Sequence, residues 1–200
     1  MHLVLGLGNP GRQYERTRHN AGFLVVDRLA ERHGFVCDKR QFDALVGKGR
    51  VGTVDAMFGK PQSFMNRSGH PASSLRGYYK VDRTDVVVVH DEIDLPFGDV
   101  RVKVGGGHGG HNGLRDLVAQ LGGADFARVR FGVGRPPAGW DVADYVLGKW
   151  SSTEQDALDE RVDHAAEVVE AVLVDGPRAA MNQFNVRRPG RSADPETSTD

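Results

Sequence analysis

Four consecutive valines at positions 86–89, followed directly by His90 and Asp91, constrain the fold more than any other stretch. An unbroken run of β-branched residues is typical of a central strand that is buried on both faces by helices. Other segments that suit strands are residues 1–7, 42–60, 99–104 and 127–134. Segments with helical spacing of apolar residues are 20–34, 66–80, 112–121 (capped by Asn112), 153–174 and 177–184. This order predicts an α/β fold, a single-domain three-layer sandwich with a central mixed, mostly parallel sheet flanked by helices.

Length and composition indicate one globular domain. The chain has 200 residues, of which 39% are hydrophobic and 26% charged, and a chain of this size can bury a core without disulfides. We expect the domain to span residues 1–186 and the polar segment 187–200 to form a disordered tail. We expect no membrane span and no signal peptide. The single cysteine, Cys37, suits packing in a reducing cytoplasm.

Positive charge is concentrated in one part of the sequence, although the formal net charge is only -1. Between Gly98 and Arg135 the basic residues outnumber the acidic ones; they are Arg101, Lys103, Arg115, Arg128, Arg130 and Arg135. Residues 151–175 are acidic, with Arg161 as their only basic residue. One part of the surface is therefore suited to face phosphate groups, and another to face away from them.

The segment 6–11 spells G-x-G-x-x-G directly after an apolar run, which is the pattern of a dinucleotide-binding turn. That turn requires a helix to begin at the third glycine, but residues 12–18 have no apolar stripe. Pro10 removes one amide from the loop, and Asp27, at the spacing of the ribose-binding acid, falls inside a predicted helix. The residues therefore favour a tight turn that presents Asn9 at the edge of the sheet over an NAD site.

Polar side chains follow predicted strands or precede predicted helices, where α/β sheets bind ligands. His19 is a candidate general base, because an imidazole titrates near neutral pH, or else a solvated or capping residue. Asp91, at the end of the valine strand, can orient that imidazole or serve as a loop or cap residue. Asn9, Asn66 and Asn112 each offer a donor and an acceptor for a peptide group or an oxyanion, or act as helix caps.

A second set of side chains has the chemistry of metal ligands. Its members are His90, Asp91, Asp94, His108 and His111. The H-x-x-H spacing lies in the glycine-rich segment 105–110, which favours a loop over a site, and the chain has neither H-E-x-x-H nor a cysteine ligand. We predict no metal and no other cofactor, and keep a metal-dependent hydrolase using His90, Asp94, His108 and His111 as an alternative.

Several motifs in compatible order resemble those of the bacterial-type peptidyl-tRNA hydrolase family. They lie in residues 5–11, 17–22, 64–69, 90–98 and 105–114, and the similarity extends from Met1 to about Val186. The resemblance implies a monomeric cytoplasmic enzyme without a cofactor. Such an enzyme cleaves the ester between a peptide, or an N-blocked aminoacyl group, and the 3'-terminal ribose of tRNA. It implies contacts with the acceptor stem and 3' end of peptidyl-tRNA.

The resemblance also assigns roles to individual positions. His19 matches the catalytic base and Asp91 its orienting carboxylate. The positions that match substrate-binding residues are Asn9, Tyr14, Met65, Asn66, His111 and Asn112. The positions that match tRNA phosphate-binding residues are Arg101, Lys103 and Arg128. The oxyanion donor stays open between Asn66 and an amide near it, and a module that binds tRNA without cleaving the ester stays an alternative.

Overall fold

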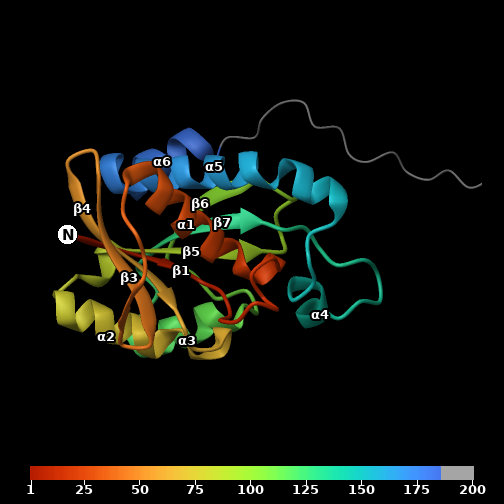
Figure 1. Ribbon diagram of the computed structural model, residues 1–200, viewed down its shortest axis with the longest axis horizontal. Helices are drawn as coiled ribbons and strands as arrows, with labels where there is room; N and C mark the ends of the chain where they lie inside the picture. Colours follow the sequence, from red (N-terminus) through yellow and green to blue (C-terminus); the bar gives the residue numbers. More distant parts are fainter. Residues whose placement is uncertain (186–200) are drawn as a thin grey trace, which may run out of the picture.

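The computed structural model describes residues 1–185, which form one seven-stranded sheet between two layers of helices (Figure 1). The strand order across the sheet is β2-β3-β4-β1-β5-β7-β6. The strands are β1 (His2–Gly6), β2 (Lys39–Gln41), β3 (Ala44–Val51), β4 (Val54–Pro61), β5 (Val86–Glu92), β6 (Val100–Val104) and β7 (Ala127–Gly132). The predicted three-layer α/β fold is therefore confirmed.

The sheet is mixed, with parallel strands at its centre. Strands β4, β1, β5 and β7 run parallel to one another, whereas the pairs β2–β3, β3–β4 and β6–β7 toward the two edges are antiparallel. The predicted hairpin of residues 42–60 corresponds to β3 and β4. Strand β2 was not predicted, because its three residues are all polar and show no alternation.

Helices cover both faces of the sheet. They are α1 (Ala21–His33), α2 (Gly69–Tyr79), α3 (Asn112–Leu121), α4 (Val142–Val146), α5 (Ser152–Asp175) and α6 (Pro177–Phe184). Figure 1 shows α1, α5 and α6 on one face, α2 and α3 on the other, and α4 beyond one end of the sheet. Within residues 1–185, no helix combines the length and apolarity needed to cross a bilayer. The predicted domain boundary at 186 and the tail from 187 lie outside the described residues.

The valine run of β5 is buried on both faces, as its sequence predicts. Val87 and Val89 belong to the core beneath α1 and α5, while Val86 and Val88 belong to the core beneath α2 and α3. Burying a valine side chain stabilises a fold by about 1.5 kcal/mol or more. The strand is therefore anchored from both layers, and Asp91, its next-to-last residue, has a fixed position.

The opening glycines allow α1 to pack directly on the backbone of β1. A Cβ atom added at Gly6 would lie 2.3 Å from the carbonyl oxygen of Gly22, and one added at Gly22 would lie 2.4 Å from the backbone nitrogen of Leu7. No helix begins at Gly11; the chain continues to a 3-10 turn, η1 (Arg18–Asn20), ahead of α1. The glycine pattern thus serves contact between strand and helix, in agreement with the rejection of a dinucleotide turn.

Candidate active site

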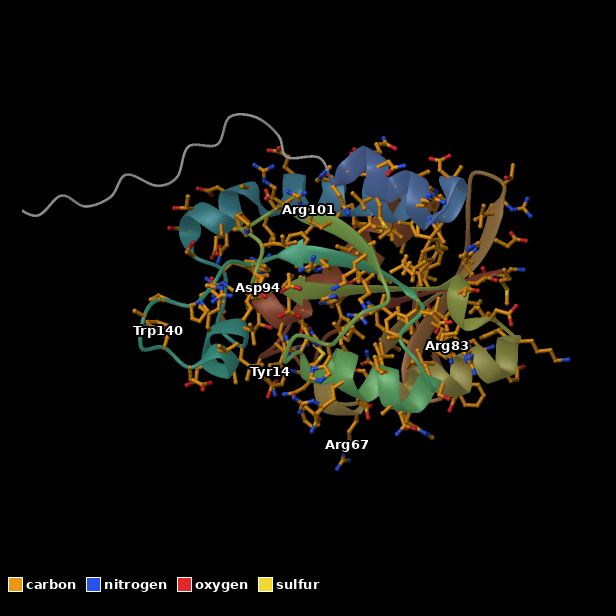
Figure 2. All side chains as sticks on the ribbon, turned by 180° about the vertical axis from the view of Figure 1, so that it is seen from behind. Tyr14, Arg67, Arg83, Asp94, Arg101 and Trp140 are labelled. Atoms are coloured by element: carbon orange, nitrogen blue, oxygen red, sulfur yellow. The ribbon has the colours of Figure 1, made fainter. Side chains whose placement is uncertain are left out.

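The polar residues singled out in the sequence meet at the carboxyl ends of β1 and β5. A cavity of about 960 Å³ is lined by His19, Asp91 and all of the predicted substrate-binding residues, Asn9, Tyr14, Met65, Asn66, His111 and Asn112. Figure 2 shows Tyr14 and Asp94 at this end of the sheet and Arg83 at the opposite end. The convergence follows from the parallel central strands, whose carboxyl ends share one edge.

His19 and Asp91 form a hydrogen-bonded pair at the floor of the cavity. The Nδ1 atom of His19 lies 2.9 Å from each carboxylate oxygen of Asp91. The side chains are 13% and 2% exposed, so solvent reaches the imidazole but hardly reaches the carboxylate. Since an ionised carboxylate only accepts hydrogen bonds, Nδ1 carries the proton, and Nε2 of the neutral ring is left with a lone pair.

The pKa values of this pair suit a base and its anionic partner. Burial alone lowers the pKa of His19, but the negative charge of Asp91 and the hydrogen bond to it raise that pKa above its ordinary 6.5. Burial alone raises the pKa of Asp91, but the charges and hydrogen bonds of His19 and His111 hold it well below 3.8. Asp91 is therefore a carboxylate at neutral pH and stabilises the protonated form of His19.

His111 joins the same carboxylate from the other side. Its Nε2 donates to Oδ1 of Asp91 at 3.0 Å, and its Nδ1 accepts a hydrogen bond from the backbone N–H of Leu114 at 3.3 Å. His111 is therefore the N-cap of α3. The expected cap, Asn112, is instead the first residue of the helix, where its exposed side chain lines the cavity. The sequence prediction missed this because histidine is an unusual N-cap.

Asn9 is fixed at the cavity wall by three hydrogen bonds. Its backbone N–H donates to Oδ1 of Asn20 at 2.8 Å, and its carbonyl accepts from Nδ2 of Asn20 at 3.0 Å. Its side-chain oxygen accepts from the backbone N–H of Met65 at 2.7 Å. With that oxygen occupied, the amide NH₂ of Asn9 is the group available to a ligand. Asn66, by contrast, is exposed on the turn η2 (Met65–Arg67).

Arg18 supports the loop that carries His19, a role the sequence prediction missed. Its guanidinium donates to the carbonyl of Lys149 at 2.9 Å, pairs with Glu154 at 2.7 Å and lies 4.3 Å from the centre of the Tyr145 ring. The side chain is 11% exposed, so this is a buried ion pair linking η1 to the start of α5. The residues next to Arg18 in the sequence do not indicate that it is buried, because its partners lie far along the chain.

The short helix α4 supplies an apolar wall that the sequence prediction also missed. Val142, Val146 and Leu147 line the cavity, together with Ile93. The signal was present in Asp141, whose side chain accepts from two backbone N–H groups of the first turn as an N-cap. Beside the His19–Asp91 pair there is thus a surface suited to apolar side chains.

The predicted phosphate-binding residues lie on the edge strand β6 and its neighbour β7. Lys103 pairs with Arg128 across the two strands, and Arg101 pairs with Arg130, so all four point to one face. The helices that contact β6 and β7 are α5 and α6, which cover the other face. Lys103 is exposed, Arg130 forms an ion pair with Glu92, and Arg101 donates to the carbonyl of Asn185. Arg130, which the sequence prediction left out, lies beside Arg101.

Arg128 departs from the expected role at the surface. It is 2% exposed, and its guanidinium donates to the carbonyl oxygens of Gly107 at 2.7 Å and Gly106 at 2.6 Å. A side chain enclosed in this way is not available to a phosphate in this conformation. A contact of Arg128 with tRNA phosphate stays a prediction from the sequence; in this conformation the glycine-rich segment folds over the side chain, which strand periodicity alone cannot reveal.

The alternative metal-binding set is not brought together. Asp94 pairs with Arg135, and Nδ1 of His108 accepts from the backbone N–H of Gly110. Among residues 1–185, the group of His, Cys, Asp or Glu ligands that comes within metal-binding reach is His19, Asp91 and His111, with ligand atoms within 4.8 Å of one another. These atoms are the ones that form the hydrogen bonds of His19 and His111 to Asp91.

His90 lies next to Asp91 and His111 but does not line the cavity. Its Nδ1 lies 2.7 Å from the carbonyl oxygen of Asp91, and its ring meets the ring of His111 edge-on, with centroids 5.0 Å apart. Complete burial, assisted by the proximity of His111, lowers the pKa of His90 to about 3. His90 is therefore a neutral packing residue at physiological pH.

Comparison with known proteins identifies the family. The family model described as peptidyl-tRNA hydrolase matches residues 3–193. A peptidyl-tRNA hydrolase of Syntrophotalea carbinolica is 51% identical over 187 residues, covering 94% of this chain and 98% of the relative. One from Frankia alni is 48% identical, covering 92% and 93%. The crystal structure of peptidyl-tRNA hydrolase from Acinetobacter baumannii superposes with a TM-score of 0.86 at 41% identity, covering 95% and 97%. The chain therefore belongs to the peptidyl-tRNA hydrolase family.

Proposed function

We propose that the protein hydrolyses the ester bond between a peptide, or an N-blocked aminoacyl group, and the 3'-terminal ribose of tRNA. The observation that carries the proposal is the His19–Asp91 pair, with Nδ1 held at 2.9 Å by the carboxylate and the ring lining the cavity. An ester has a better leaving group than an amide, so a water molecule activated by a base can cleave it without a covalent intermediate on the enzyme.

In this mechanism, Nε2 of His19 takes a proton from a water molecule while the oxygen of that water attacks the ester carbonyl. The ring becomes an imidazolium, which the charge of Asp91 stabilises through Nδ1. The tetrahedral intermediate then collapses: the bond to the ribose 3' oxygen breaks, and that oxygen takes the proton from Nε2. The products are a peptide with a free carboxylate and a tRNA with a free 3'-terminal ribose hydroxyl.

The side-chain amide of Asn9 is the donor that we assign to the oxyanion. Its oxygen is already occupied by the N–H of Met65 at 2.7 Å, which turns the NH₂ group away from that contact. A donor held by the protein before the reaction stabilises developing charge more than a mobile one does. Asn66 and Asn112, both exposed on the cavity wall, are then free to bind the ends of the substrate.

The remaining contacts divide the substrate between two surfaces. The apolar side chains Met65, Val142 and Leu147 suit the peptide, and Tyr14 and His111 complete the cavity. The exposed Lys103, with Arg101 and Arg130 beside it, suits phosphates of the acceptor stem and 3' end. Contacts with phosphates read no base sequence, as an enzyme acting on many tRNAs requires. We propose that the protein acts as a monomer in the cytoplasm.

The deciding experiment is to incubate the protein with N-blocked aminoacyl-tRNA and follow release of the N-blocked amino acid by cleavage of the ester. Free aminoacyl-tRNA is the control substrate. We expect cleavage of the blocked substrate and little cleavage of the free one. Binding of tRNA without cleavage would instead support an RNA-binding module. Loss of activity after dialysis against a chelator, restored by Zn²⁺, would support the metal-dependent alternative.

A further inference from the structure

The glycine-rich segment between β6 and α3 is held at both ends. At its end, His111 donates to Asp91 and caps α3. At its start, the fork of Arg128 donates to two successive carbonyls, those of Gly106 and Gly107. Between these anchors, the residues from 108 to 110 line the catalytic cavity.

Arg128 is a buried cation whose partners are neutral. None of the ion pairs formed within residues 1–185 includes Arg128, and Glu92 is already engaged by Nε of Arg130 at 3.0 Å. Burial and the charge of Arg130 both lower the pKa of Arg128. A guanidinium is expensive to bury, and Phe126, whose ring centre lies 5.1 Å away, offsets only part of that cost. Core packing alone would be served better by an apolar residue at this position.

The segment needs an anchor because few of its backbone groups are bonded: the N–H of Gly105 donates to the carbonyl of Phe126 at 3.4 Å, and that of His111 to the carbonyl of His108 at 3.0 Å. Gly105, Gly106, Gly109 and Gly110 all have positive φ, which glycine adopts freely, so the unrestrained segment has many conformations. The hydrogen bonds from Arg128 to the carbonyls of Gly106 and Gly107 stabilise one of these conformations. Lys103 runs alongside: a Cβ atom added at Gly106 would lie 2.9 Å from its Nζ. The anchored conformation therefore leaves room for the Lys103 ammonium beside the segment.

We propose that Arg128 is a positioning residue, which fixes the glycine-rich segment as a wall of the catalytic cavity and as a neighbour of Lys103 without itself contacting phosphate. Arg128 thereby links the phosphate-binding face of β6 and β7 to the cavity where the ester is cleaved. Its effect on substrate binding rests on the proposed function, whereas its effect on the segment does not.

The test compares Arg128→Met, Arg128→Lys and, as a matched control, Arg178→Met, which removes an exposed arginine of α6. Hydrogen exchange of the amides of residues 105–111 measures the anchor without any substrate. A hydrogen bond to a charged group is worth a factor of about ten or more in an equilibrium constant. We therefore expect exchange in this segment to accelerate at least about tenfold in Arg128→Met and to stay unchanged in Arg178→Met.

Kinetics on N-blocked aminoacyl-tRNA then separate positioning from phosphate contact. We expect Arg128→Met to raise KM by about tenfold while kcat changes by less than about threefold, since His19, Asp91 and His111 keep their contacts. The slope of log KM against log salt should match that of the unmodified protein, whereas Lys103→Met should reduce its magnitude by about 0.7 to 0.9.

Two results would overturn the proposal. A salt slope reduced in Arg128→Met as much as in Lys103→Met would make Arg128 a direct phosphate ligand. Unchanged exchange of residues 105–111 would show that another contact holds the segment. If Arg128→Met does not fold, Arg128→Lys decides by the same exchange measurement, because a lysine lacks the planar fork that spans both carbonyls. Absence of esterase activity would refute the proposed function and leave the exchange result standing.

Discussion

The Nδ1 atom of His19 lies 2.9 Å from both carboxylate oxygens of Asp91, although the two residues are 72 positions apart in the sequence. His19 lies on the 3-10 turn that leads into α1, and Asp91 lies near the end of β5. Because α1 and β5 belong to one packed core, the pair is formed before any substrate arrives. The predictions below follow from this arrangement and from the groups around it.

Replacing the proposed base should remove most of the activity. We expect His19→Ala to lower kcat by about 100- to 10,000-fold, because that is the usual contribution of a general base. The measurement is ester release from N-blocked aminoacyl-tRNA. His70→Ala, which removes an exposed histidine of α2, is the matched control and should keep full activity. Near-normal turnover by His19→Ala would refute the mechanism.

The pH profile of kcat/KM should report the influence of Asp91. His19 acts as a base only when neutral, so activity should rise with pH through its pKa, which Asp91 raises above 6.5. In Asp91→Asn the lowering effect of burial remains and the raising effect is lost. We therefore expect the rising limb to move to lower pH while the maximal rate falls. A limb that stays in place would mean that another group is being titrated.

Asn9→Asp tests the assigned oxyanion donor. The substitution keeps an oxygen for the N–H of Met65 but replaces the NH₂ group with a second oxygen. We expect kcat to fall by about 100- to 1,000-fold, the usual effect of losing one such donor. Asn182→Asp, at an exposed position of α6, controls for the added charge. A kcat close to normal would move the donor elsewhere, with Asn66 as the next candidate.

The salt dependence of binding should depend on Lys103. Each phosphate neutralised by a basic side chain contributes about 0.7 to 0.9 to the slope of log affinity against log salt. We expect Lys103→Ala to weaken tRNA binding and to flatten this slope by one such increment. Lys48→Ala, which removes an exposed lysine of β3, should leave the slope unchanged. An unchanged slope in Lys103→Ala would argue against phosphate contact at this position.

His90 should make the protein less stable in acid. Its pKa is lowered from 6.5 to about 3, so between these values the unfolded chain binds a proton that the folded chain does not. The free energy of unfolding should therefore fall as pH falls through this window, by about 1.4 kcal/mol per pH unit. Denaturant unfolding at several pH values measures the slope. The slope should fall by about the contribution of one proton in His90→Asn and stay the same in His70→Asn. Equal slopes in the unmodified protein and both variants would contradict the burial of a neutral His90.

The sequence predicted those features whose signals are local. The valines of β5 are apolar on both faces, so the strand, its central place and the position of Asp91 at its end follow from one short stretch. His19 was assigned as the candidate base because the motif around it resembles that of the family. In both cases the neighbouring residues determine the environment, and the structure places them where the pattern indicates.

What escaped prediction depends on partners that are distant in the chain. Arg128 alternates with apolar residues of β7, which is typical of an exposed strand position, until residues 106 and 107 fold over it. Arg18 is buried only because Glu154 and Lys149 return to it from α5 and the segment before it. Strand periodicity describes which face a residue occupies, and tertiary contacts decide whether that face is open.

The direct packing of Gly22 on β1 has a consequence for which substrates the cavity can accept. With backbone against backbone, the turn bearing His19 cannot slide relative to the strand whose end leads to Asn9. The proposed base and the proposed oxyanion donor therefore keep a fixed separation, which suits only a carbonyl group that can lie between them.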